Sequence, residues 1–119
     1  MMTTMPTFSR GDVVLVLFPN SDLRTAKTRP ALVIQADNLD TDLPQVIVAM
    51  LTSKTFRAKY PSRVLVEIDS KTGENSGLLS DSVVMTDNLT TIAEIGINRV
   101  IGKLPMDAID KALKHTLEL

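Results

Sequence analysis

The 119-residue sequence has no cysteine, no tryptophan, one histidine and one tyrosine. Without cysteine there is no disulfide framework, no thiol nucleophile and no thiolate metal site, which fits a reducing compartment. Three phenylalanines beside the single tyrosine make broad stacking of nucleic-acid bases a limited resource. The only histidine, His115, lies off the apolar stripe of the C-terminal segment and is expected to face solvent. These absences argue against thiol and histidine mechanisms.

Long hydrophobic stretches are also missing. The longest apolar runs, 13–18 and 46–51, are too short to span a bilayer. The first residues have neither a basic region nor an apolar region of the kind found in signal peptides. We therefore expect a cytoplasmic protein, and the 44% hydrophobic and 23% charged residues predict one globular domain over 1–119 with its own core.

The formal net charge of −1 argues against a strongly basic nucleic-acid binder, but it conceals an asymmetry. Residues 1–63 hold 8 Lys and Arg against 5 Asp and Glu, and residues 64–119 hold 5 against 9. Seven of the eight cations of the first half form two groups, Arg24, Lys27 and Arg29, and Lys54, Arg57, Lys59 and Arg63. They predict one positive surface, with ordinary solvated loops as the alternative.

The apolar pattern indicates a mainly β protein. Residues 12–18 and 30–36 are rich in Val, Leu and Ile, and 46–51 is apolar throughout, as in strands covered on both faces. Shorter strands are expected at 64–68, 82–85 and 98–104. Five or six short strands predict a small barrel.

The chain ends in an expected helix. Pro105 suits a first helical turn, and Met106, Ile109, Leu113 and Leu117 recur at helical spacing, which predicts an amphipathic helix packed on the barrel. The one clear turn segment is 70–77.

Two strand ends carry candidate functional side chains. Because a residue before proline is pushed into an extended conformation, Arg29 is expected to begin its strand and to share a face with Ala31 and Val33. Thr52, followed by Ser53 and Lys54, stands where the third run leaves the core. If the second and third strands are antiparallel neighbours, Arg29 and Thr52 meet at one edge.

A guanidinium beside a hydroxyl suits chemistry at a phosphate. When a ribose 2′-hydroxyl attacks the adjacent phosphorus, charge builds on the phosphoryl oxygens, and a fixed two-pronged donor such as Arg29 stabilises it. Thr52 is able to donate to the same phosphate or to orient the attacking group. Arginine is a poor general base, so the base stays unassigned. The sequence shows no phosphate-binding glycine loop, zinc signature or carboxylate cluster, and we expect no metal or cofactor.

The order and spacing of five motifs resemble one family over nearly the whole chain. They are Arg10-Gly11-Asp12-Val13-Val14-Leu15-Val16, Arg29-Pro30-Ala31-Leu32-Val33-Ile34-Gln35, Leu51-Thr52-Ser53, Asp81-Ser82-Val83-Val84 and Ile101-Gly102-Lys103-Leu104. In these the sequence resembles the MazF/PemK toxin endoribonucleases of type II toxin–antitoxin systems. The resemblance implies an SH3-like barrel of five to seven strands with a C-terminal helix.

The same resemblance implies a homodimer that cleaves single-stranded RNA at selected sequences and is neutralised by a cognate antitoxin covering the RNA groove. It carries the catalytic pair over to Arg29 and Thr52. Substrate contacts are expected from the first connection and from the turn after the third strand, with one aspartate beyond the Asp-Ser motif. These residues are Arg24, Lys27, Ser53, Lys54 and Asp87.

Several positions depart from the family pattern. One branch has an arginine where this chain has Met85, and many relatives have one where it has Thr90. Leu17 replaces an acidic residue frequent in the family, and the first connection lacks the usual glycines. Recognition or rate is expected to differ accordingly.

Simpler structural roles are open for each candidate. Arg29 is also interpretable as a rim arginine paired with Asp22 or Asp12, Thr52 and Ser53 as turn caps, and the Asp81-Ser82 pair as a structural hydrogen-bonding unit.

Two other functions are open as well. One is a toxin of this fold that binds a protein target such as gyrase through its dimer surface and C-terminal helix. The other is a catalytically silent member that binds only antitoxin and DNA, which the missing arginines leave open.

Overall fold

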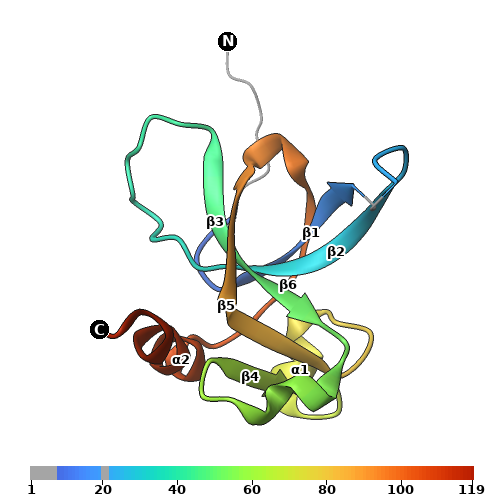
Figure 1. The fold of residues 1–119 in the computed structure, drawn as a ribbon, viewed down its shortest axis with the longest axis vertical. Helices are drawn as coiled ribbons and strands as arrows, with labels where there is room; N and C mark the ends of the chain where they lie inside the picture. The colour runs from blue at the N-terminus through green and yellow to red at the C-terminus, as the bar shows by residue number, and fades with distance from the viewer. Residues whose placement is uncertain (1–7, 20–21) are drawn as a thin grey trace.

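Six strands form one antiparallel sheet in the computed structural model, which describes residues 8–19 and 22–119 (Figure 1). The sheet order is β4-β5-β3-β2-β1-β6. The strands are β1 (Asp12–Pro19), β2 (Ala26–Val33), β3 (Gln45–Thr52), β4 (Arg63–Val66), β5 (Ser82–Ala93) and β6 (Ile97–Lys103). The expected mainly β fold with five to seven strands is confirmed.

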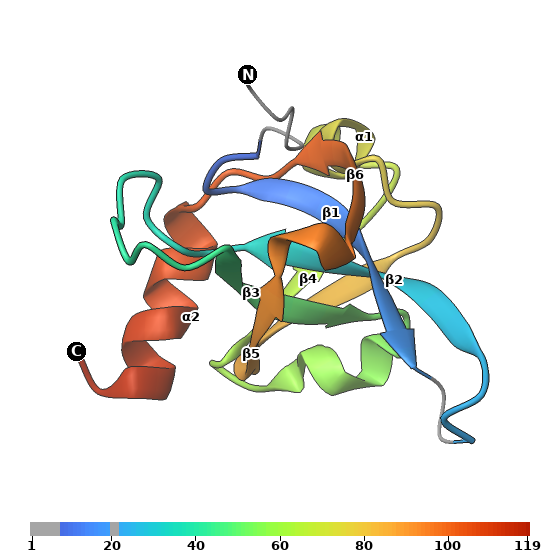
Figure 2. The ribbon, with the colours of Figure 1, turned by 90° about the horizontal axis from the view of Figure 1, so that it is seen from above.

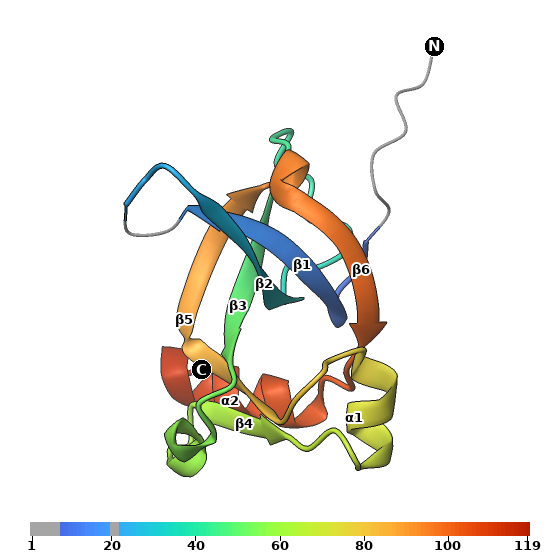
Figure 3. The same ribbon diagram turned by 90° about the vertical axis from the view of Figure 1, so that its right-hand side faces the viewer.

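The sheet curls strongly, as Figure 3 shows, with β5, β3, β2, β1 and β6 arranged around a common centre. Its two edge strands are β4 and β6, and in the described part of the chain no ladder of hydrogen bonds joins them. The expected SH3-like barrel is therefore a curled sheet in which hydrogen-bonded closure is not detected.

Both faces of the sheet are covered, which explains the continuous apolar runs in the sequence. Alternate residues of β1, β2, β3 and β5 supply most of two clusters. The first lies inside the curl and consists of Val14, Val16, Ala31, Val33, Val46, Val48, Met50, Val83, Met85 and Ile97. The second lies on the other face and consists of Val13, Leu32, Ala49, Leu51, Val66, Val84, Leu104 and Ile109. We call these two sides the inner face and the outer face.

The expected C-terminal helix is α2 (Asp107–Leu117), which packs on β5 and β4 (Figure 2). Ile109 is 1% exposed and Ala112 is also buried, but Leu117 is half exposed. Leu117 was wrongly included in the buried stripe. The helix turns its contact face through Ile109, Ala112 and Thr116, and the Thr116 hydroxyl lies 2.7 Å from that of Thr86.

The segment 70–77, expected as a turn, contains a short helix, α1 (Lys71–Ser76). The Ser70 hydroxyl accepts a hydrogen bond from the Gly73 amide at 3.0 Å, which caps the helix start. Gly77 ends it in the left-handed conformation, with φ of 73°. Two single turns of 3-10 helix complete the fold, η1 (Thr55–Lys59) and η2 (Glu94–Gly96).

Two strands are longer than expected. β2 begins at Ala26 instead of residue 30, because its first half pairs with β1 as far as Pro19 opposite Ala26. β5 extends to Ala93 instead of residue 85, since a register shift at Ala49 and Met50 lets its polar second half pair with β3. Neither helix of the described chain is long and apolar enough to cross a membrane.

Candidate active site

Arg29 lies in the middle of β2, opposite Val16 of β1. The sequence predicted that Arg29 begins its strand. This is wrong, because the β1–β2 hairpin extends beyond it to Ala26. Its side chain is exposed and follows Ala31 and Val33 on the inner face. Lys27, two residues earlier, is exposed on the same face. The inner face thus passes from a buried apolar core to a cationic surface along one strand.

Thr52 ends β3, on the same face as Met50. β2 and β3 are antiparallel, as expected, and Ala31 lies opposite Met50 where their ladder ends. Arg29 and Thr52 each lie two residues beyond this last pair, one on each strand. Beyond the ladder the strands diverge, with β2 arriving from the upper right and β3 leaving toward the lower right (Figure 1). Arg29 and Thr52 therefore belong to the two strands at the place where these separate.

The turn after Thr52 fixes its hydroxyl without using its proton. The Lys54 amide donates to Thr52 Oγ1 at 3.2 Å, so the expected capping role is present. A hydroxyl that accepts one hydrogen bond keeps its own proton for donation. Ser53 and Lys54 are both exposed beside it.

The carboxylates weighed as partners of Arg29 are engaged elsewhere. Asp22 accepts from the amides of Arg24 at 2.9 Å and Thr25 at 3.1 Å, and these bonds lower its pKa. Asp12 pairs with Lys103 at 3.5 Å. Within residues 8–19 and 22–119, no ion pair involves Arg29. The exposed Arg24 side chain projects from the loop that Asp22 braces.

Asp87 is held by Arg63, a contact that the sequence pattern does not indicate. Arg63 Nε donates to Asp87 Oδ1 at 2.8 Å and Arg63 NH2 to Oδ2 at 2.7 Å. This hydrogen bonding lowers the pKa of Asp87 and raises the pKa of Arg63. Thr52 pairs with Val83, four residues before Asp87 and roughly 13 Å away along β5. The side-chain partner of Asp87 is thus Arg63, at the start of β4.

The second basic group lies on and around η1. Lys54, Arg57 and Lys59 belong to this turn or its start, and Arg63 begins β4. In Figure 3 the β1–β2 hairpin ends at the upper left, and η1 lies at the lower left, on the same side of the molecule. The two cationic groups predicted from the sequence therefore occur on one side of the molecule.

The Asp81 and Ser82 side chains have structural partners. Asp81 accepts from the Ile68 amide at 2.9 Å, and the Ser82 hydroxyl donates to the Ser80 carbonyl oxygen at 2.9 Å. His115 is exposed, as expected.

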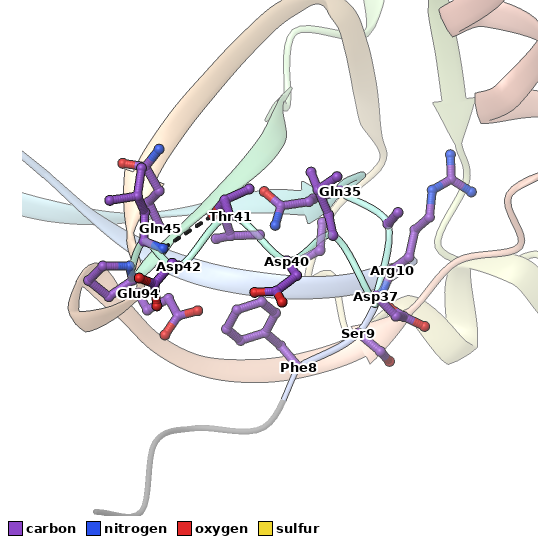
Figure 4. Close-up of a pocket in the computed structure, with 16 residues that line it drawn as sticks. Phe8, Ser9, Arg10, Gln35, Asp37, Asp40, Thr41, Asp42, Gln45 and Glu94 are labelled. Atoms are coloured by element: carbon purple, nitrogen blue, oxygen red, sulfur yellow. Dashed lines mark hydrogen bonds between the residues drawn. The ribbon is translucent and has the colours of Figure 1, made fainter.

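A hollow of about 640 Å³ under the long β2–β3 connection has the opposite charge (Figure 4). Its wall includes four carboxylates, of Asp37, Asp40, Asp42 and Glu94, against one cation, Arg10. Such a lining repels a phosphate backbone. In the described residues, no group of three or more His, Asp or Glu side chains is arranged to hold a metal ion.

The small curled β-sheet thus carries exposed cations and a hydroxyl where β2 and β3 separate. Comparison with known proteins gives the family. The model of the PemK-like, MazF-like toxins of type II toxin–antitoxin systems matches residues 9–117. This chain belongs to that family, and the resemblance predicted from its motifs is confirmed.

Individual relatives agree along most of the chain. Endoribonuclease EndoA of Bacillus subtilis is 36% identical over 114 residues, covering 92% of this chain and 94% of the relative. Endoribonuclease MazF6 of Mycobacterium tuberculosis is 33% identical over 107 residues, covering 87% and 90%. A mycobacterial endoribonuclease solved in complex with its cognate antitoxin has the same fold, with a TM-score of 0.71 at 22% identity over 95% of this chain and 97% of that one.

Proposed function

We propose that this protein is the toxin of a type II toxin–antitoxin system and cleaves single-stranded messenger RNA at selected sequences, with Arg29 and Thr52 as its catalytic pair. The observation that carries the pair is their register: both extend the inner face at the point where β2 and β3 separate. Family membership supports the reaction class.

The reaction is an internal transesterification. The 2′-oxygen forms a bond to the adjacent phosphorus, the bond from phosphorus to the 5′-oxygen breaks, and a 2′,3′-cyclic phosphate and a 5′-hydroxyl result. The proton of the 2′-hydroxyl leaves to solvent, and the 5′-oxygen takes one up. Arg29 stabilises the charge that develops on the phosphoryl oxygens, and Thr52 donates its free proton to one of them. No metal enters this scheme.

The exposed polar residues around this pair provide the substrate contacts. Arg24 and Lys27 lie on the loop and strand on one side, and Ser53 and Lys54 on the turn on the other. Cations of this kind bind phosphates and set the position of the strand. Asp87 contributes by holding Arg63 at the cationic side.

The proposal includes the partners implied by family membership. A homodimer acts in the cytoplasm, and a cognate antitoxin neutralises it. The mycobacterial endoribonuclease solved with its antitoxin supports such a partner.

The test is cleavage of a long unstructured RNA by purified protein in excess EDTA. Arg29→Ala and Thr52→Ala are expected to lose about 10²–10³-fold in rate, because each removes a donor to the transition state. Arg29→Lys keeps the charge without the two-pronged geometry and should lose an intermediate amount. Thr52→Ser should retain most activity.

Two substitutions serve as matched controls, Arg99→Ala on β6 and Thr91→Ala on β5, both exposed. Circular dichroism establishes that every variant folds. Intact RNA in EDTA that is cut when Mg²⁺ is added would overturn the metal-independent scheme. Equal cutting by the Arg29 and Thr52 variants would remove this pair. Intact RNA under all conditions, with toxicity retained, would instead favour a protein target.

A further inference from the structure

Two aromatic side chains are exposed in the basic segment around η1. Phe56 is 68% exposed and Tyr60 is 60% exposed. Aromatic rings are mostly buried in folded proteins, so two exposed rings within one run of basic residues call for an explanation. The segment begins three residues after Thr52, so it is continuous with the proposed cleavage site.

The Tyr60 ring is supported on one side by an arginine. The guanidinium carbon of Arg63 lies 5.3 Å from the ring centroid, within the range of a cation–π contact. Arg63 is itself fixed, since it donates to both oxygens of Asp87 and to the Arg57 carbonyl oxygen at 2.9 Å. An exposed ring supported in this way loses little freedom when a ligand stacks on it.

The neighbouring cations are available to a ligand. Lys54, Arg57 and Lys59 make no ion pair with any carboxylate in the described residues. The Arg57 guanidinium lies over the Phe56 ring at 5.8 Å, as a second cation on a second ring. The segment from Thr52 to Arg63 contains no acidic residue.

A recess of about 500 Å³ lies beside the Tyr60 ring. It is bounded by Arg57, Tyr60 and Ser62 on one side and by Asp87 and His115 on the other. It combines an aromatic wall with guanidinium, hydroxyl and imidazole groups that form hydrogen bonds to base edges.

We propose that Tyr60 and this recess form a second RNA subsite, in which a base outside the cleaved bond stacks on the ring while Arg57 and Lys59 bind the flanking phosphates. The subsite rests on the proposed RNA-cleaving function and extends its substrate path beyond Arg29 and Thr52. Single-stranded nucleic acid is favoured over an acidic peptide, because a peptide carboxylate uses the cations but leaves the ring faces without a partner.

The chain carries its own probe for this subsite. Tyr60 is the only tyrosine and there is no tryptophan, so intrinsic tyrosine fluorescence reports on this one ring. The ligand is an unstructured RNA oligonucleotide with 2′-O-methyl groups, which binds without being cleaved because the attacking hydroxyl is blocked. Stacking of a base is expected to quench the fluorescence in a saturable way.

Affinity is measured in parallel from the anisotropy of a dye-labelled copy of the same oligonucleotide. Tyr60→Leu should weaken binding by about 5- to 150-fold, which is the range that a stacked base contributes on alanine substitution. Tyr60→Trp should bind like wild type because it keeps an aromatic face. Lys59→Ala should reduce the salt dependence of binding by about one phosphate contact.

Matched controls separate the subsite from general surface effects. Leu79→Ala removes an apolar side chain that is 95% exposed elsewhere, and Lys111→Ala removes an exposed lysine of α2. Neither should change affinity. A thermal melt shows that the Tyr60 variants are folded.

The outcomes distinguish this subsite from the function on which it rests. Binding without quenching, or Tyr60→Leu binding like wild type, overturns the subsite while RNA cleavage through Arg29 stands. If the wild-type protein neither binds nor cleaves RNA, both the subsite and the proposed function are overturned. Quenching by a glutamate-rich peptide and not by the oligonucleotide shows a peptide site and overturns the RNA assignment.

Discussion

Arg63 and Asp87, 24 residues apart in the sequence, form a two-pronged ion pair with donor–acceptor distances of 2.8 and 2.7 Å. Arg63 begins β4, the shortest strand and one edge of the sheet, and Asp87 belongs to its neighbour β5. The pair therefore fastens an edge strand to the body of the sheet, and it fixes the Tyr60 ring at the same time.

The first prediction concerns the pH dependence of this pair. Hydrogen bonding from Arg63 holds the pKa of Asp87 below its usual value of 3.8. A lowered folded-state pKa means that the stabilisation is fully present above about pH 4 and is lost as the pH falls through the folded-state pKa. Asp87→Asn should therefore lower the free energy of unfolding at pH 7 by about 1 kcal/mol, as for a partly exposed pair with bidentate geometry.

This effect is measured by denaturant unfolding at pH 7 and at about pH 2.5. The difference between wild type and Asp87→Asn should shrink at the lower pH. Asp40→Asn, in an exposed loop, is the matched control and should differ little from wild type at either pH. An equal difference at both pH values would show that the charge of Asp87 does not contribute.

The second prediction tests the contact face of α2. Ile109 is 1% exposed in the outer-face cluster, and Leu117 is 50% exposed. Ile109→Ala should lower the free energy of unfolding by about 2–4 kcal/mol, because it removes buried apolar volume. Leu117→Ala should stay within about 0.5 kcal/mol of wild type. Comparable losses for both, measured by urea unfolding, would restore the four-residue stripe predicted from the sequence.

The third prediction compares two glycines of different surroundings. A Cβ on Gly102 of β6 would lie 2.2 Å from backbone atoms of Ser76, whereas one on Gly96 would meet nothing within 4 Å. Gly102→Ala should cost about 2 kcal/mol or more, because backbone must move to admit it. Gly96→Ala should be nearly neutral. Thermal melts of the two variants measure the difference, and similar melting temperatures would contradict the close approach.

Apolar patterning predicted a part of every strand and missed the polar extensions of β2 and β5. Residues 46–51 are apolar at every position, and β3 covers them. The second half of β5, which includes Asn88 and Thr90, has no such run, because only its pairing with β3 makes it a strand. The same holds for Lys27 and Thr28, which are held in β2 by β1. Pairing partners distant in sequence leave no local signal.

The candidate site was predicted to a similar extent. Pro30 correctly indicated that Arg29 is extended, and the antiparallel relation of its strand to β3 is confirmed. The bond from Arg63 to Asp87 was not predicted, because it depends on the register of β4 against β5, where Arg63 lies opposite Met85. The catalytic roles of Arg29 and Thr52 and the binding roles of the other candidate residues stay predictions until the variants are measured.

The helix α1 connects the two ends of the curled sheet. It belongs to the connection between β4 and β5 at one end of the sheet, yet it packs against β6 at the other end. At that contact Gly77 approaches the Ile101 carbonyl oxygen and Gly102 approaches Ser76, too closely for any side chain. In the described chain no hydrogen bonds join the two edge strands. The curled sheet is closed instead by van der Waals contact between two backbone segments. Its closure depends on the absence of side-chain atoms as much as on any bond between strands.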